Sequence, residues 1–179
     1  MSRLQRAATV VALVRCLRER DGWAGETQIQ KAVYFLQRLL DVPTAWQYSL
    51  YKYGPFSFDL RDALTEMRAD GFLTLEPQRP PYGPRLAAGP GSDALMDRTA
   101  DVLEHYENAV NFVADRLAPM AVGALERVAT ALFVTDELCI ADDRERAEKI
   151  NELKPHVFVD EALTSVGELD AMRAALAKP

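Results

Sequence analysis

The chain has 179 residues, of which 49% are hydrophobic and 27% are charged, and its formal net charge is −6. This composition is typical of a globular protein and excludes general disorder, because a disordered chain lacks the apolar residues for a core. No apolar run approaches the roughly 20 residues that cross a bilayer. Arg15, Arg18 and Arg20 interrupt the first apolar stretch, which therefore does not resemble a signal peptide. We expect a cytoplasmic protein.

Three segments of the N-terminal half show the apolar spacing of amphipathic helices. They cover residues 3–20, 27–40 and 57–70. The second segment has so wide an apolar face that we expect its helix at the centre of the core. Ser57 is well placed to cap the third helix, and Gly71 is well placed to end it in the left-handed conformation.

Strand patterns flank the third predicted helix. Residues 48–53 alternate as in a half-buried strand, and Gly54-Pro55 is expected to form the tight turn into the helix. Beyond the helix, residues 72–76 and 85–88 can pair as a hairpin across a proline-rich loop. This order of elements is typical of a winged helix-turn-helix. We therefore predict a mostly α (α+β) fold, with a winged helix-turn-helix-like N-terminal part and a small β-hairpin wing.

The second half of the chain is predicted to be helical and is far more acidic. Residues 1–91 contain 12 Lys and Arg against 9 Asp and Glu, whereas residues 92–179 contain 9 against 18. We predict a winged-helix-like domain over 1–91 and an acidic α-helical extension, packed on it, over 92–179. Gly89-Pro90-Gly91 marks the expected boundary. The helices of the extension are predicted at residues 95–117, 119–134, 142–153 and 159–176.

Side chains suited to catalysis are sparse. Cys16 and Cys139 are each flanked by aliphatic residues, and we expect two buried free thiols. His105 and His156 have no second His or Cys at metal-ligand spacing. The chain has no nucleophile motif, so we predict that it is not an enzyme and that it uses no cofactor.

An acidic cluster late in the chain is the one group that could hold a divalent cation. Its spacing matches no calcium-binding loop. We interpret it as a solvated loop whose last two residues lie in the first turn of the following helix, where carboxylates complement the helix dipole. No metal site is therefore predicted. The cluster consists of Asp136, Glu137, Asp142 and Asp143.

Three short motifs carry a family resemblance. Residues 27–36 read TQIQKAVYFL, residues 53–60 read YGPFSFDL and residues 150–156 read INELKPH. They resemble the K-x-x-Y-x-L, Y-G-P-[FY]-S and L-K-P elements of the YwgA-like family of bacterial proteins and, more distantly, the Panacea (SocA-like) antitoxin domain. The YwgA-like resemblance implies no defined activity. The Panacea resemblance implies neutralisation of a toxin, and its SocA-like members deliver a toxin to a protease.

The tyrosines of the predicted strand have two interpretations. Alternate tyrosines can form one face of a half-buried strand, and tyrosines at a surface also anchor protein partners. We predict a non-enzymatic regulatory or antitoxin-like protein-interaction module. Its acidic half would attract a basic protein, such as a toxin or a nucleic-acid-associated protein. The predicted contact surface consists of Tyr48, Tyr51, Tyr53 and Arg61.

A DNA-binding transcriptional regulator is the alternative. Its third helix would enter the major groove, yet residues 57–70 carry two arginines against four acidic residues, which DNA phosphates repel. The amides that begin this helix could also hold an anion, but Asp59 already neutralises that end. A homodimer is compatible with either function. The nucleic-acid contacts of this alternative are Arg61, Arg68, Arg79 and Arg85.

Overall fold

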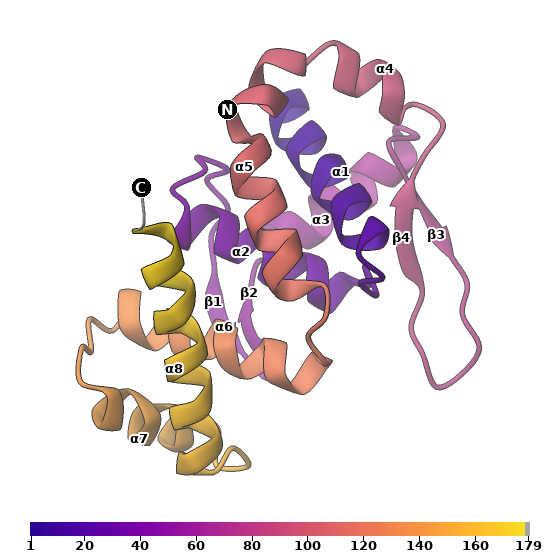
Figure 1. Ribbon diagram of the computed structural model, residues 1–179. Helices are drawn as coiled ribbons and strands as arrows, with labels where there is room; N and C mark the ends of the chain where they lie inside the picture. The colour runs from indigo at the N-terminus through magenta and orange to yellow at the C-terminus, as the bar shows by residue number, and fades with distance from the viewer. Residues whose placement is uncertain (178–179) are drawn as a thin grey trace. The chain divides into compact units, whose positions relative to one another are not determined.

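The computed structural model describes residues 1–177, which are mainly helical with short antiparallel strand pairs (Figure 1). This confirms the predicted mostly α class. Within the described residues, no helix combines the length and the apolar character of a membrane crossing. The helices are α1 Arg3–Glu19, α2 Glu26–Leu39, α3 Phe58–Ala69, α4 Ser92–Asp97, α5 Ala100–Leu117, α6 Val122–Asp136, α7 Asp143–Leu153 and α8 Val159–Leu176; the strands are β1 Ser49–Tyr51, β2 Gly54–Phe56, β3 Leu73–Glu76 and β4 Arg85–Ala88.

The chain forms two compact units that differ from the predicted domains 1–91 and 92–179. The first unit consists of Met1–Tyr48 and Ser57–Met120. The second consists of Ser49–Phe56 together with the chain from Ala121 onward. The expected boundary at residues 89–91 therefore lies inside the first unit, and the β1–β2 hairpin belongs to the second.

Residues 89–91 fail as a boundary because their backbone is bonded to the end of α3. The Gly89 amide donates to the Phe72 carbonyl, and the Gly91 amide donates to the Gly71 carbonyl, each at 2.9 Å. A Cβ on Gly89 would lie 2.3 Å from the Gly71 oxygen, so this close approach requires glycine. Beyond this point α4 and α5 pack on α1, which places them in the core of the first unit.

The predicted helices of the first unit are present with their predicted caps. Residues 3–20 and 27–40 form α1 and α2. The Ser57 hydroxyl accepts the Leu60 amide at 3.1 Å and begins α3, and Gly71 follows α3 with a φ of 74°. The connection from α2 to α3 includes the β1–β2 hairpin, so it is longer than the tight turn of a helix-turn-helix motif.

Helix α2 lies at the centre of the first unit, as predicted, but it buries polar side chains as well as apolar ones. Gln28, Gln30 and Lys31 are each at most 4% exposed. The Gln30 amide group forms a two-way pair with the Ser57 backbone, because its oxygen accepts the Ser57 N–H at 3.0 Å and its nitrogen donates to the Ser57 carbonyl at 2.9 Å. Gln28 accepts the Ala24 amide at 2.6 Å and donates to the Leu117 carbonyl at 3.0 Å.

The predicted helix over residues 95–117 is interrupted. Helix α4 ends at Asp97 and α5 begins at Ala100. Between them, the buried Thr99 hydroxyl donates to the Leu95 carbonyl at 2.9 Å, and its φ of −130° departs from helical geometry. Thr9 and Thr130 make the same kind of bond within unbroken helices, so this bond accompanies the break and does not by itself explain it.

The Gly54-Pro55 segment is not a simple turn into α3, which corrects the prediction. It forms strand β2, which pairs antiparallel with β1, with Ser49 opposite Phe56 and Tyr51 opposite Gly54. Residues 52 and 53 make the tight turn, and Gly54 leaves it with a φ of 92°. A single strand over 48–53 was therefore wrong, because the left-handed glycine reverses the chain and pairs it with itself.

Helices α6, α7 and α8 form the helical part of the second unit, close to the predicted ranges. Their apolar residues meet in a core that includes Leu125, Ile150 and Val166. Arg146, whose side chain is 5% exposed, extends between the helices and donates to both carboxylate oxygens of Asp170 at 2.9 and 2.6 Å. This bidentate ion pair joins α7 to α8.

The two cysteines are free thiols in different environments. Cys16 is half-buried on α1. Cys139 is exposed in the connection after α6, with a φ of 55°. The expectation of burial was therefore wrong for Cys139, because its aliphatic neighbours lie in an irregular segment and not on a packed helix face.

We expect the substitution Gln30→Met to lower the free energy of unfolding by about 2 kcal/mol, because the Ser57 N–H loses its buried partner and the Ser57 carbonyl keeps only the Arg61 amide. Urea unfolding would measure this loss. The matched control is Gln78→Met, since Gln78 makes only a 3.4 Å contact to the nearby Glu76 carbonyl. A change below about 0.5 kcal/mol for Gln30→Met would show that the pair with Ser57 is dispensable.

The substitution Gly89→Ala should destabilise the first unit by about 2 kcal/mol, because the new methyl group would collide with the backbone of Gly71. Gly83→Ala is the control, since a Cβ there meets nothing within 4 Å. Thermal or urea unfolding of both variants would test this difference. Equal stability of the two variants would contradict the proposed backbone contact.

Candidate functional site

The tip of the β1–β2 hairpin presents two exposed tyrosines. Tyr51 is 58% exposed and Tyr53 is 52% exposed. The Tyr51 ring has its centroid 6.0 Å from that of Phe56 on the facing strand, and the Lys52 ammonium lies 5.2 Å from the Tyr53 ring centroid. The two predicted contact residues of this hairpin are therefore at the surface, each with a side-chain neighbour in the hairpin.

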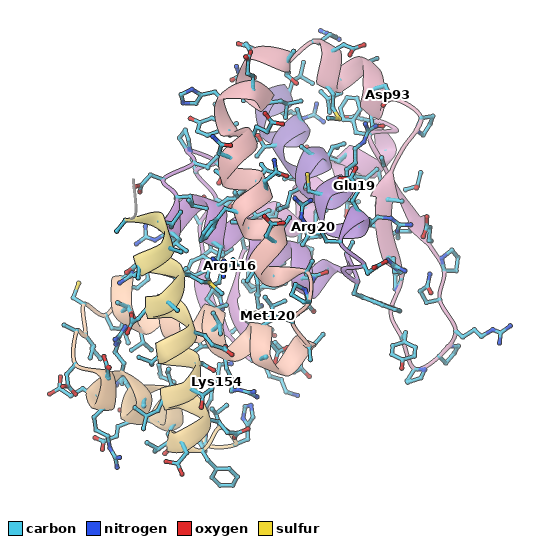
Figure 2. All side chains as sticks on the ribbon, in the orientation of Figure 1. Glu19, Arg20, Asp93, Arg116, Met120 and Lys154 are labelled. Carbon is cyan, nitrogen blue, oxygen red and sulfur yellow. The ribbon has the colours of Figure 1, made fainter. Side chains whose placement is uncertain are left out.

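A buried lysine fixes the backbone of this hairpin. Lys154, labelled in Figure 2, is 5% exposed. Its ammonium group donates to the Lys52 carbonyl at 2.7 Å and approaches the Tyr51 carbonyl at 3.5 Å. Burial lowers the pKa of Lys154, and the nearby Glu126 carboxylate opposes that change. The ammonium thus supplies the donors that the turn carbonyls need in place of water.

This contact brings together two of the motifs that carry the family resemblance. Tyr53-Gly54-Pro55-Phe56 forms the turn and β2, and Leu153-Lys154-Pro155 ends α7. The lysine of the second motif bonds the turn that leads into the first. From the sequence, Lys154 is recognisable only as a residue at a helix end, because its partner lies about 100 residues away. The signal available was a lysine followed by proline at a helix end, which does not predict a partner.

The other two predicted contact residues lie in the first unit. The hydroxyl of Tyr48 is buried, and its ring packs on Tyr34 with centroids 4.7 Å apart. Burial raises the pKa of Tyr48 well above its ordinary value, and Tyr34 adds to the rise. Arg61 is exposed on α3, donates to Asp62 at 3.1 Å and lies over the Phe58 ring. Tyr48 is therefore mainly a packing residue.

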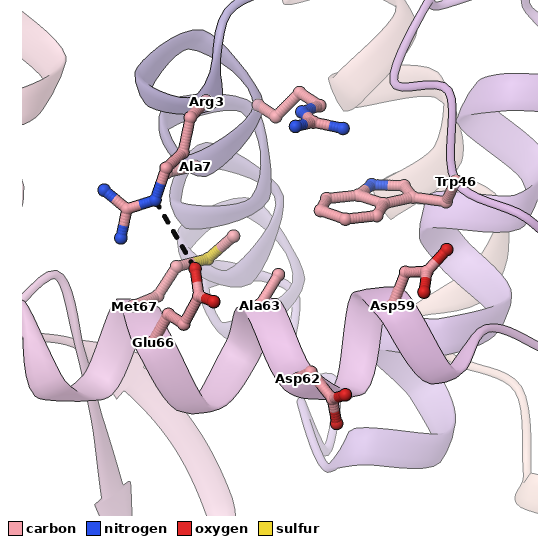
Figure 3. A pocket seen from close by; sticks show the side chains of 9 residues that line it. Arg3, Ala7, Trp46, Asp59, Asp62, Ala63, Glu66 and Met67 are labelled. Carbon is pink, nitrogen blue, oxygen red and sulfur yellow. Dashed lines mark hydrogen bonds and ion pairs between the residues drawn. The ribbon is translucent and has the colours of Figure 1, made fainter.

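The surface of α3 bears on the DNA-binding alternative. A cavity of about 290 Å³ lies between α1, α3 and the segment before the hairpin (Figure 3). Trp46 forms one wall, with the Arg6 guanidinium 4.6 Å from its ring centroid. Figure 3 shows Arg3 paired with Glu66, and Arg3 also bonds Asp70. The carboxylates on this face of α3 are those of Asp59, Asp62 and Glu66.

Among the arginines of the DNA alternative, two are committed to contacts within the chain. Arg61 pairs with Asp62. Arg85 donates to the carbonyls of Trp23 at 2.8 Å and Gly22 at 3.0 Å, and it stacks over the Trp23 ring. Arg68 and Arg79 are exposed. The three carboxylates on α3 oppose phosphate contacts, so Arg68 and Arg79 are the exposed arginines that remain for this alternative.

The acidic residues after α6 serve local structure. The Asp142 side chain accepts the Glu145 amide at 2.9 Å and caps α7, which confirms its predicted place at the start of that helix. Asp136 pairs with Arg173, and Asp143 pairs with Arg146. Within residues 1–177, no cluster of three or more His, Cys, Asp or Glu side chains is arranged to hold a metal ion.

No protein-family model and no curated protein matches this chain.

We expect Lys154→Met to loosen the hairpin, because the carbonyls of residues 51 and 52 lose their donor. Hydrogen–deuterium exchange should become faster over residues 49–56. Lys149→Met, which removes a surface ion pair on the same helix, should leave that exchange unchanged. Unchanged exchange in Lys154→Met would show that the lysine does not hold the turn.

The lowered pKa of Lys154 also predicts a pH dependence. Between the lowered pKa and the ordinary value of 10.5, the folded protein binds fewer protons at this group than the unfolded chain does. The free energy of unfolding of the wild type should therefore rise, relative to that of Lys154→Met, as the pH increases toward 10.5. Urea unfolding of both proteins at several alkaline pH values would measure the difference, and an opposite trend would contradict the buried position.

Proposed function

We propose that this chain is a non-enzymatic regulatory protein-interaction module, antitoxin-like in character, that binds its partner through the tip of the β1–β2 hairpin. The observation that carries the proposal is the pair of exposed tyrosines, Tyr51 and Tyr53, on a turn held by buried Lys154. Tyrosines in such positions are common anchors of protein interfaces, because they bury a large area at a small entropic cost.

Preorganisation is the physical advantage of this hairpin. A loop that is disordered before binding loses conformational freedom on association, which weakens the complex. Here the Lys154 ammonium bonds the turn carbonyl of Lys52, and the strands pair from Ser49 to Phe56. The two tyrosines are therefore presented in one backbone conformation, which supports a role in recognition.

The charge of the chain favours a basic partner. The net charge is −6, and residues 92–179 contain 18 acidic against 9 basic residues. Complementary charge accelerates encounter and discriminates against acidic competitors. A basic toxin or a nucleic-acid-associated protein fits this requirement, and the Panacea-like resemblance of the Y-G-P motif agrees with it. DNA itself is the weaker candidate because α3 presents carboxylates.

Affinity capture would test the proposal. Tagged wild type and a Tyr51→Ala/Tyr53→Ala variant would be incubated with lysate of the source organism, with and without nuclease. We expect a stoichiometric protein that is captured in both conditions and whose recovery falls about tenfold or more with the variant, as for the loss of two anchor residues. Tyr82→Ala is the matched control, because Tyr82 is 64% exposed on the β3–β4 loop in the first unit.

Two outcomes would overturn this proposal. Equal capture by the wild type and the double variant would show that the hairpin tip is not the contact surface. Recovery of DNA, with all proteins lost after nuclease treatment, would favour the transcriptional regulator. In that case binding to duplex DNA should weaken steeply with salt and with substitution of Arg68 and Arg79.

A further inference from the structure

A second cavity, of about 400 Å³, lies between α1 and α5 in the first unit. Its apolar lining comes from four side chains on α1, α4 and α5. Its polar lining includes the half-buried Cys16 and three glutamates. The apolar residues are Ala12, Met96, Leu103 and Val110, and the glutamates are Glu19, Glu104 and Glu107.

The cavity follows the axes of two parallel helices. Cys16 contacts Asn111, and Arg20, one turn later on α1, bonds Asp115, one turn later on α5. The two helices therefore run in the same direction where they touch. The lining residues of α5 extend from Leu103 to Asn111, a distance of about 12 Å at 1.5 Å per residue. A groove of that length matches two turns of a third helix.

Two of the three glutamates of this groove have no cation to neutralise them. Glu104 and Glu107 form no ion pair with any residue over the described range 1–177. Arg20, which Figure 2 labels beside Glu19 at the end of α1, bonds Asp115, Asn111 and the Cys16 carbonyl. Its Nη1 atom is 4.0 Å from the nearest Glu19 oxygen, the limit of an ion pair.

The negative charge of Glu19 affects the pKa of the half-buried Cys16 thiol. Burial raises the pKa of Cys16, and the Glu19 carboxylate raises it further. Arg20 acts in the opposite direction, through its charge and its hydrogen bond. The groove therefore combines an apolar lining with an acidic rim. An apolar side chain that enters it is favoured by burial, and a cation beside that side chain is favoured by the glutamates.

We propose that the α1–α5 groove is a docking site for a cationic amphipathic helix of a protein partner, with its apolar residues on Met96 and Leu103 and its lysines or arginines beside Glu104 and Glu107. The inference extends the proposed function, since it presumes a protein partner, but it uses a surface in the other unit from Tyr51 and Tyr53. Helix-in-groove recognition requires an apolar stripe on the ligand at helical spacing.

A labelled synthetic helical peptide, with leucines on one face and lysines on the other, is the probe. Fluorescence anisotropy would measure its affinity for the wild type, and the same peptide with glutamates in place of lysines should not bind. Glu104→Gln/Glu107→Gln should weaken binding about tenfold, and the loss should shrink at high salt. The single variant Glu107→Gln has its own control, Glu168→Gln, which removes the same charge from an exposed position of α8 in the second unit.

Two further measurements separate docking in the groove from adhesion to an acidic surface. Ala12→Trp, which fills the groove without changing charge, should abolish peptide binding. The peptide should also slow alkylation of Cys16 by iodoacetamide, read by mass spectrometry, while the exposed Cys139 in the second unit reacts at an unchanged rate. This protection uses the wild-type chain, so it decides the question even where Ala12→Trp fails to fold.

The inference is overturned by peptide binding that Glu104→Gln/Glu107→Gln does not weaken, by equal protection of Cys16 and Cys139, or by no binding at all. These failures are distinct from failure of the hairpin. Tyr51→Ala/Tyr53→Ala should bind the peptide like the wild type, because its groove is intact. If Tyr51→Ala/Tyr53→Ala no longer captures the partner but still binds the peptide normally, the result supports both the hairpin tip and the groove as binding surfaces.

Discussion

The first unit depends on the hydrogen bonds that α2 makes through its glutamines. Gln28, Gln30 and Gln37 each accept from a backbone N–H group and donate to a backbone carbonyl, and Gln28 and Gln30 are buried. Buried backbone groups must find partners, and an unpaired one costs as much as a whole hydrogen bond contributes. Helix α2 therefore fixes the irregular chain around it, including the start of α3. Its glutamine side chains provide backbone hydrogen bonds that a larger β-sheet would otherwise provide.

In the second unit, a lysine is the hydrogen-bond partner of irregular backbone. Lys154 extends from the end of α7 to the hairpin turn, where its ammonium bonds the Lys52 carbonyl. The buried charge is costly, and the lowered pKa reflects that cost. The hairpin gains a fixed tip that carries Tyr51 and Tyr53. Lys154 orders the turn, and it thereby determines how the two tyrosines of the proposed recognition surface are presented.

The distribution of paired and unpaired charges bears on the choice between a protein partner and DNA. Arginines of the first unit, such as Arg3, Arg61 and Arg85, are held by carboxylates or carbonyls within the same unit. The glutamates of the α1–α5 groove, Glu104 and Glu107, lack such partners. Carboxylates that lack cations repel phosphate and attract basic protein segments, so the α1–α5 groove is the place where we propose that a basic partner docks.

The sequence by itself determined most of the helices, the wing hairpin and the caps at Ser57, Gly71 and Asp142, because apolar periodicity and capping depend on neighbours within one or two turns. It did not show the break between α4 and α5. The contact role of Tyr51 and Tyr53 stays a prediction. The tertiary structure decided the rest: that residues 89–91 lie inside the first unit, that Gly54-Pro55 pairs with β1, and that Lys154 meets a turn about 100 residues earlier. These features depend on contacts between distant residues, and no local pattern of side chains encodes which distant partner a buried polar group will find.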